Sequence, residues 1–263
     1  MSDSSTMEDE KIFPRLRLFN LIMGFFHLAQ AILMLILSNG FALPITTSYL
    51  SYSVASRSVM PIIDTLTNLK IGPLVSVFLF ISAAAHFLLT LPGIYDWYVR
   101  NLKKGMNLAR WIEYSLSSSV MIVVIAMLCG VYDLPSLIML FALNACMILF
   151  GLVMEVHNQT TEKTNWLSFI FGCFAGLLPW IVIAMYFLGA ARATDGIIPS
   201  FVYVILISLF VSFNIFAINM VLQYKKVGKW KYYVWGEIIY ILLSLVAKSA
   251  LAWQVFSGTL RPQ

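Results

Sequence analysis

Long runs of apolar residues dominate the chain and recur seven times, separated by more polar segments. Each run can cross about 30 Å of hydrocarbon as a helix, since a helix rises about 1.5 Å per residue. The runs cover residues 13–38, 71–92, 107–130, 135–157, 164–189, 198–224 and 231–257. Five of the six connections are short, which favours antiparallel neighbours. We therefore predict an all-α membrane protein: one seven-helix domain over residues 1–263, with residues 1–12 as a polar cytoplasmic tail.

The connection over residues 39–70 is the long one. Its segment ITTSYLSYSV (45–54) is rich in β-branched and aromatic residues, a composition typical of strands. The segment predicts a short β-hairpin lying on the bundle, and an irregular loop is the alternative.

Composition agrees with a membrane protein, because 60% of the residues are hydrophobic and only 11% are charged. An ordinary soluble domain is therefore excluded. The net charge of +5 does not indicate nucleic-acid binding, because the basic residues gather at helix ends. Residues 1–11 are polar and acidic, so we expect no cleavable signal peptide. No cysteine or histidine spacing indicates a metal site.

The distribution of Lys and Arg predicts the orientation in the cell membrane. Of the 17 basic residues, 12 lie on the side that holds the N-terminus and the second, fourth and sixth connections. These are Lys11, Arg15, Arg17, Arg100, Lys103, Lys104, Arg110, Lys163, Lys225, Lys226, Lys229 and Lys231. The opposite side holds four: Arg57, Lys70, Arg192 and Arg261. We expect the N-terminus in the cytoplasm and the C-terminus outside.

Lys248 is the only charged residue in the apolar stretch YILLSLVAKSALAWQVF (240–256). A lysine at this depth costs about 2.5–3.5 kcal/mol on insertion scales, so a specific partner is expected to offset the cost. A buried carboxylate is one such partner. An aldehyde is another, because a desolvated lysine can react as the neutral amine and form a Schiff base.

Glu113 is the candidate carboxylate for Lys248. It lies in the third span, and Ser117, four residues on, continues the same helix face inward. The alternative is an interfacial glutamate paired with Arg110, three residues earlier. On the seventh span, Ser244 precedes Lys248 by one turn, and Glu237 precedes it by three turns on roughly the same face.

Further polar residues lie inside the predicted spans, and so do large aromatic side chains. A lone histidine in a helix is more often structural than proton-handling, and Glu155 can equally face water at the end of its span. Most of the aromatic residues are expected to pack or to face lipid, whereas a subset could line a slot for a flat apolar ligand. The polar candidates are His27, Ser82, His86, Asn144 and Glu155; the aromatic ones include Trp180, Phe210 and Phe213.

Three stretches make a resemblance specific: RWIEYSLSSSVMI (110–122), FGCFAGLLPWI (171–181) and SLVAKSALAWQVFSGTL (244–260). With a lysine in the seventh helix, a carboxylate in the third and the inverted orientation, the whole chain resembles the heliorhodopsins, a family of microbial retinal proteins. The resemblance implies a non-enzymatic photoreceptor that binds all-trans retinal on Lys248 as a protonated Schiff base, with Glu113 as its counterion. It also implies a homodimer and a short β-ladder after the first helix.

The resemblance assigns the remaining residues as well. Ser117 and Ser244 would form hydrogen bonds near the Schiff base, and Trp180, Phe210 and Phe213 would contact the retinal. His27, Ser82, His86, Asn144 and Glu155 match positions around a polar, water-containing cavity on the cytoplasmic side, and the resemblance implies that this cavity receives the proton during the photocycle.

Three functions compete at this point. The first is a light sensor with a slow photocycle and no net ion pumping, which signals by conformational change to a partner that the sequence does not identify. The second is a light-driven or light-gated ion transporter. Helix three disfavours a proton pump, because position 124, three turns beyond Glu113, is Val124 and no acid follows before Asp133. The third is a seven-helix protein without retinal, in which Lys248 and Glu113 form a structural ion pair.

Overall fold

The computed structural model describes residues 3–193 and 198–260, and within these ranges seven helices are long and apolar enough to cross a membrane. They are α1 (Asp3–Leu37), α2 (Ile71–Leu88), α4 (Leu108–Leu128), α5 (Leu134–His157), α6 (Leu167–Ala193), α7 (Ser200–Tyr224) and α8 (Tyr233–Val255), which continues as the π-helical turn η2 (Phe256–Leu260). The predicted seven-helix bundle is therefore confirmed. The helix α1 begins at Asp3, so residues 3–12 of the predicted tail are helical.

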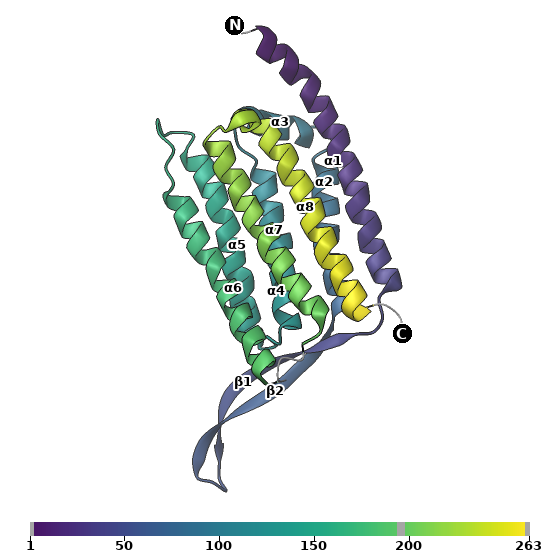
Figure 1. The fold of residues 1–263 in the computed structure, drawn as a ribbon, viewed down its shortest axis with the longest axis vertical. Coiled ribbons are helices and arrows are strands. Elements are labelled where there is room, and N and C mark those ends of the chain that lie inside the picture. Colours follow the sequence, from purple (N-terminus) through teal and green to yellow (C-terminus); the bar gives the residue numbers. More distant parts are fainter. Residues whose placement is uncertain (1–2, 194–197, 261–263) are drawn as a thin grey trace.

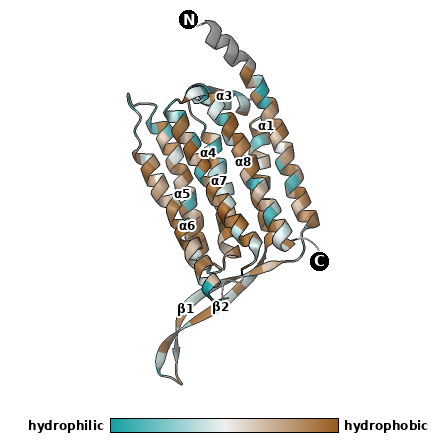
Figure 2. Ribbon diagram, in the orientation of Figure 1, coloured by the Kyte–Doolittle hydropathy of each residue, from teal (hydrophilic) through white to brown (hydrophobic). Residues whose placement is uncertain are grey.

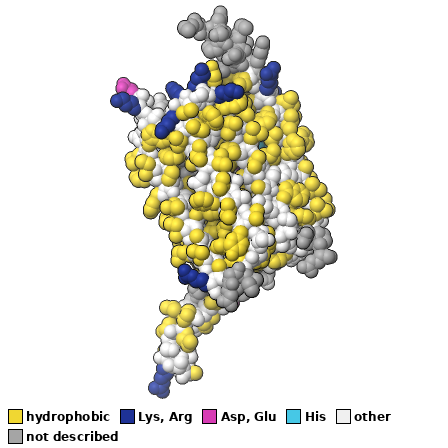
Figure 3. Space-filling model, in the orientation of Figure 1, with side chains coloured by type: hydrophobic (Ala, Val, Ile, Leu, Met, Phe, Trp, Pro, Cys, Tyr) yellow, Lys and Arg dark blue, Asp and Glu magenta, His cyan; other side chains and the backbone are white. Residues whose placement is uncertain are grey.

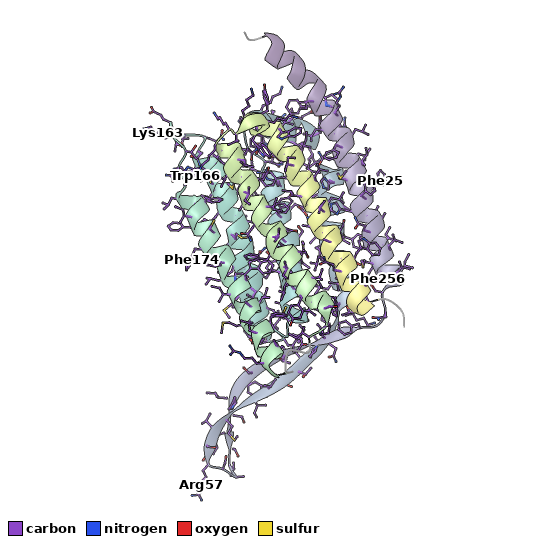
Figure 4. All side chains as sticks on the ribbon, viewed as in Figure 1. Phe25, Arg57, Lys163, Trp166, Phe174 and Phe256 are labelled. Atoms are coloured by element: carbon purple, nitrogen blue, oxygen red, sulfur yellow. The ribbon has the colours of Figure 1, made fainter. Side chains whose placement is uncertain are left out.

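The helices form one bundle in which neighbours along the chain pack side by side (Figure 1). Close packing joins α1 to α2, α2 to α4, α4 to α5, α5 to α6 and α7 to α8, and α8 also contacts α1 and α2. The helices are largely hydrophobic along their length (Figure 2), and the visible face of the bundle is covered mostly by hydrophobic side chains (Figure 3). Side chains such as Phe25 and Phe174 point away from the bundle (Figure 4), and they are 58% and 66% exposed. This outward apolar surface is the one that lipid covers in a membrane.

The helix α4 lies at the centre of the bundle, because it has the largest buried fraction of the seven spans. Its buried residues toward the hairpin end are apolar, including Met121, Ile122 and Ile125. Those toward the other end are polar or charged, including Arg110 and Glu113. Asn107 is the N-cap of this helix, and its side chain accepts a hydrogen bond from Arg110 N at 3.0 Å. This N-cap fixes where the polar part of α4 enters the bundle.

The long connection folds into an antiparallel hairpin of β1 (Ala42–Ser53) and β2 (Ser58–Lys70). A hairpin is confirmed, but it is neither short nor confined to the bundle surface. Its base crosses the end of the bundle, where Thr46 N donates to Tyr132 O at 2.9 Å, and its tip at Arg57 projects well beyond (Figures 1 and 4). Nearly all of β2 is exposed, because a two-stranded ribbon this long has no third element to bury its faces.

A short helix absent from our prediction, α3 (Ile94–Lys103), follows α2 at the opposite end of the bundle from the hairpin. The chain reaches it through Gly93, whose φ of 79° is a left-handed conformation that glycine adopts without strain. At ten residues α3 is too short to span, and it lies across the helix ends with Tyr98 and Leu102 buried beneath it. The 3-10 helix η1 (Gly228–Lys231) joins α7 to α8 at the same end.

The cap of α5 gives a test of the hairpin end of the bundle. Asp133 accepts hydrogen bonds from Ser136 N at 3.1 Å and from Ser136 Oγ at 2.7 Å. We expect Asp133→Ala to lower the free energy of unfolding by about 1 kcal/mol, because backbone donors of the first turn lose their acceptor. Thermal unfolding in detergent measures the change. Asp133→Asn keeps an acceptor oxygen and serves as the control; equal losses in both variants would contradict the capping role.

Candidate functional site

Lys248 and Glu113 form a buried ion pair at the centre of the bundle. Lys248 Nζ lies 2.7 Å from Glu113 Oε1, and the two residues are only 3% and 9% exposed. The Ser82 hydroxyl joins them: it donates to Glu113 Oε1 at 2.6 Å and accepts from Lys248 Nζ at 2.5 Å. Three helices, α2, α4 and α8, therefore meet through one charged cluster. A charge pair this well hydrogen-bonded offsets the cost of its own burial.

Arg110 does not pair with Glu113, which resolves the alternative that the sequence left open. Its guanidinium instead forms ion pairs with Glu155 and Glu237. Arg110 also stacks against the rings of Trp111 and Tyr240, with its Cζ 4.5 Å and 4.0 Å from their centroids. Because Arg110 is occupied, the Glu113 carboxylate is left to Lys248.

A cavity of about 230 Å³ opens on the Lys248 side of this pair, between α4, α5, α6, α7 and α8. Its walls are largely apolar and aromatic, and of the described residues that form them only Lys248 is charged. Trp180 stands at one wall in edge-to-face contact with Phe210 and Phe213, at centroid distances of 5.3 Å and 5.6 Å. The cavity thus has the composition expected of a site for an apolar ligand with one reactive or polar end.

Glycines on two helices make room in this cavity. A methyl group added at Gly176 would collide with the Met147 side chain, and one added at Gly151 would collide with the Trp111 ring. All four residues line the cavity.

Two serine hydroxyls in the cavity wall have no hydrogen-bond partner among the described residues. They belong to Ser117 and Ser244, which are 0% and 2% exposed. Both residues line the cavity together with Lys248, so the polar atoms without partners lie at the end where the amine is. The amine, the hydroxyls and the apolar walls fit an apolar aldehyde such as retinal, with its carbonyl carbon toward Lys248.

A second, smaller cavity of about 30 Å³ lies on the Glu113 side of the pair. Its polar walls include Ser82, His86, Asn20, Arg110 and Glu237. Its volume is enough for a water molecule, which polar walls would hold in place. The ion pair therefore separates an apolar cavity from a polar one, and the Tyr114 ring lines both.

The structure brings only part of the predicted polar set to this small cavity. Ser82 and His86 line it, and His27 stacks on His86 with a centroid distance of 5.5 Å. Glu155 does not face water: it is 1% exposed and lies behind the wall, bonded to Arg110. Asn144 lies elsewhere, because its amide donates to Ser118 Oγ at 2.7 Å and Ser119 Oγ at 3.0 Å on the α5 side of α4.

Several residues at this site were absent from the predicted set: Asn20, Tyr98, Asn107, Arg110 and Glu237. The signal for Glu237 was present, because it is an acid on roughly the Lys248 face of the same helix. The signal for Arg110 was ambiguous, since an arginine near a helix end usually reaches the membrane surface. No pattern in the sequence marks Asn20 or Asn107, because single asparagines are common at helix ends.

Comparison with known proteins decides the family. A family model described as Heliorhodopsin matches residues 16–260. The chain belongs to the heliorhodopsin family. Heliorhodopsins are retinal-binding, light-sensing rhodopsins, so this heliorhodopsin is a photoreceptor type of membrane protein rather than a classical enzyme. No curated protein matches the chain.

The charge pair of this heliorhodopsin predicts a stability cycle in protein made without retinal. We expect Glu113→Gln to lower the free energy of unfolding by about 3–5 kcal/mol, because a buried lysine loses its counter-charge. Adding Lys248→Met should recover most of that loss, because the double variant buries no charge at this position. Denaturant unfolding in detergent measures both. Losses that simply add in the double variant would contradict a direct interaction.

Proposed function

We propose that this heliorhodopsin is a light sensor with a slow photocycle and no net ion pumping, which signals through conformational change and uses all-trans retinal bound at Lys248. The observation that carries the proposal is the placement of the Lys248 amine, which reaches the wall of an apolar cavity while bonded to a single carboxylate. Bound retinal would supply light absorption and isomerisation, joined to Lys248 Nζ as a Schiff base.

The roles of the surrounding residues follow from their contacts. Glu113 is the counterion, since its Oε1 is the carboxylate oxygen nearest to Lys248 Nζ. Ser82 holds both partners in register through its two hydrogen bonds. Ser117 and Ser244 offer hydroxyls to the polar end of the ligand, and Trp180, Phe210 and Phe213 hold its apolar part.

A proton released at Lys248 Nζ would find acceptors close by within the protein. Glu113 and Ser82 line the small cavity, and His86 lies on the same wall with His27 stacked behind it. Tyr98 of α3 and Asn107 also line this cavity, so it lies toward the end of the bundle that holds α3. Toward the hairpin end, α4 from Met121 onward is packed in the apolar core, including Ile122, Val124 and Ile125. A proton can therefore move among the groups of the polar cavity, but the apolar core offers it no path to the other side. This arrangement supports sensing rather than pumping.

The orientation and assembly belong to the same proposal. The basic residues gather at the end that holds the N-terminus and α3 (Figure 3), which supports a cytoplasmic N-terminus and an extracellular hairpin and C-terminus. The chain forms a homodimer, as the family resemblance implies. The exposed apolar side chains of the hairpin, including Tyr49, Leu50 and Ile63, support an additional contact between the two copies.

The retinal attachment is tested by colour. Expressed with all-trans retinal, the protein should absorb visible light, and Lys248→Ala should be colourless because Lys248 carries the only amine among the described residues that line the cavity. Absorption spectra of the purified proteins measure this. Lys163→Ala, in the exposed loop before α6, is the control and should keep the colour of the unmodified protein. A coloured Lys248→Ala protein would reject the attachment site.

Transport is tested separately. Vesicles containing the retinal-bound protein should show no sustained pH change and no steady photocurrent under illumination, although flash photolysis should show a slow return to the dark state. Electrical recording in parallel with flash photolysis measures both. A robust photocurrent that disappears in Lys248→Ala would favour the alternative, a light-driven or light-gated ion transporter.

A further inference from the structure

The buried charges of this protein do not balance. Among the described residues, five side chains with a formal charge lie in the interior: Arg110, Glu113, Glu155, Glu237 and Lys248. Two are cations and three are carboxylates, so one negative charge is left over when all five are ionised. An uncompensated charge in the interior is costly, and such a group normally takes up a proton instead. The position of that proton follows from the hydrogen bonds of each carboxylate.

Glu155 is held as a carboxylate by donors on both of its oxygens. Oε1 accepts from Arg110 and from Tyr233 Oη, the latter at 2.9 Å. Oε2 accepts from Asn107 N at 2.9 Å and from Trp111 Nε1 at 2.6 Å. Backbone, indole and guanidinium N–H groups can only donate, so a proton on Glu155 would face donors at nearly every position.

Glu113 is likewise held as a carboxylate, because the Lys248 amine and the Ser82 hydroxyl both donate to its Oε1. A retinal Schiff base that carries its proton would bring the same positive charge to this position. The charge count is therefore the same with and without retinal.

Of the three carboxylates, Glu237 has the least stabilisation for a full negative charge. Its Oε1 accepts from Arg110, which it shares with Glu155, and its Oε2 accepts from Asn107 Nδ2 at 2.6 Å. Glu237 is 0% exposed and lines the small cavity. Arg110 lines the same cavity, and its buried Nε has no hydrogen-bond partner among the described residues. An unpartnered donor beside a water-sized space indicates bound water, which could accept a hydrogen bond from a protonated Glu237.

His86 is the other group on this cavity that could carry the proton. The Asn20 amide donates to Leu16 O, so its Oδ1 faces His86 Nδ1 at 2.8 Å, and Nδ1 must carry the hydrogen. A second proton on Nε2 would make a cation one helical turn from Ser82, whose hydroxyl contacts Lys248. Like charges this close oppose each other, whereas protonating Glu237 adds no cation.

The remaining titratable groups near the small cavity do not change this charge count. Tyr98 on α3 and Tyr240 on α8 carry phenol hydroxyls, and burial raises the pKa of Tyr98 to about 12, which keeps it neutral at physiological pH. His27, on α1, lies behind His86.

We propose that Glu237 carries a proton at neutral pH in the dark, as a neutral carboxylic acid that faces the small cavity and completes the charge balance of the interior.

Infrared spectroscopy of the full chain tests this assignment. Protein labelled with ¹³C-glutamate and kept dark should show a carbonyl band of a protonated carboxylic acid, shifted by the label. The band should be lost in Glu237→Gln and retained in Glu162→Gln, a matched change in an exposed loop. Protein made with and without retinal should behave alike, so a failure of retinal attachment would leave this measurement interpretable.

The outcomes that overturn the proposal are equally specific. A protein without any label-sensitive carboxylic-acid band would place the balancing charge on a histidine or a bound cation. A band that survives in Glu237→Gln would place the proton on another glutamate. If Glu237→Gln does not fold, Glu237→Asp provides the second test, because the carboxylic-acid band should persist but lose its sensitivity to the glutamate label.

Discussion

The contact between Lys248 and Glu113 is the interaction on which the rest of the structure depends. Neither charge can stay in an apolar bundle alone, so each fixes the depth and rotation of the helix that carries it. Ser82 extends the constraint to α2 through its bonds to both partners. The pair also divides the interior, because Lys248 lines the apolar cavity and Glu113 lines the polar one.

A second charged layer lies one turn nearer the α3 end, around Arg110. Its two carboxylates come from α5 and α8, and Asn107 links them by donating from its backbone N–H to Glu155 and from its side chain to Glu237. Asn107, Arg110 and Glu237 of this layer line the polar cavity, and the two ion pairs of Arg110 remove it from competition for Glu113. Glu113 therefore stays available to Lys248 because of an ion network, Arg110 with Glu155 and Glu237, whose members do not line the apolar cavity.

The heliorhodopsin fold could be predicted from the sequence nearly completely. Seven spans were found, and apart from the start of α1, which lies ten residues earlier than predicted, their ends agree within about four residues. Apolar run length is a strong signal where lipid is the solvent. The hairpin was weaker: its strand composition was visible, but its length and projection were not, since no buried face gives β2 a period. The amphipathic helix α3 was missed because ten residues with charges resemble a loop when spans are being counted.

The site divides in the same way. The sequence by itself determined the lysine, its carboxylate and the apolar surroundings of both, because a charge in an apolar span is conspicuous and needs a partner. It could not determine with which acids Arg110 forms ion pairs or that Glu155 is buried. Nor could it determine that Asn144 donates hydrogen bonds to the serines of α4. Those choices depend on helix rotation and on which side chains reach one another across the bundle. Only the tertiary structure places three carboxylates and two cations around one interior, and with them the charge that a proton must balance.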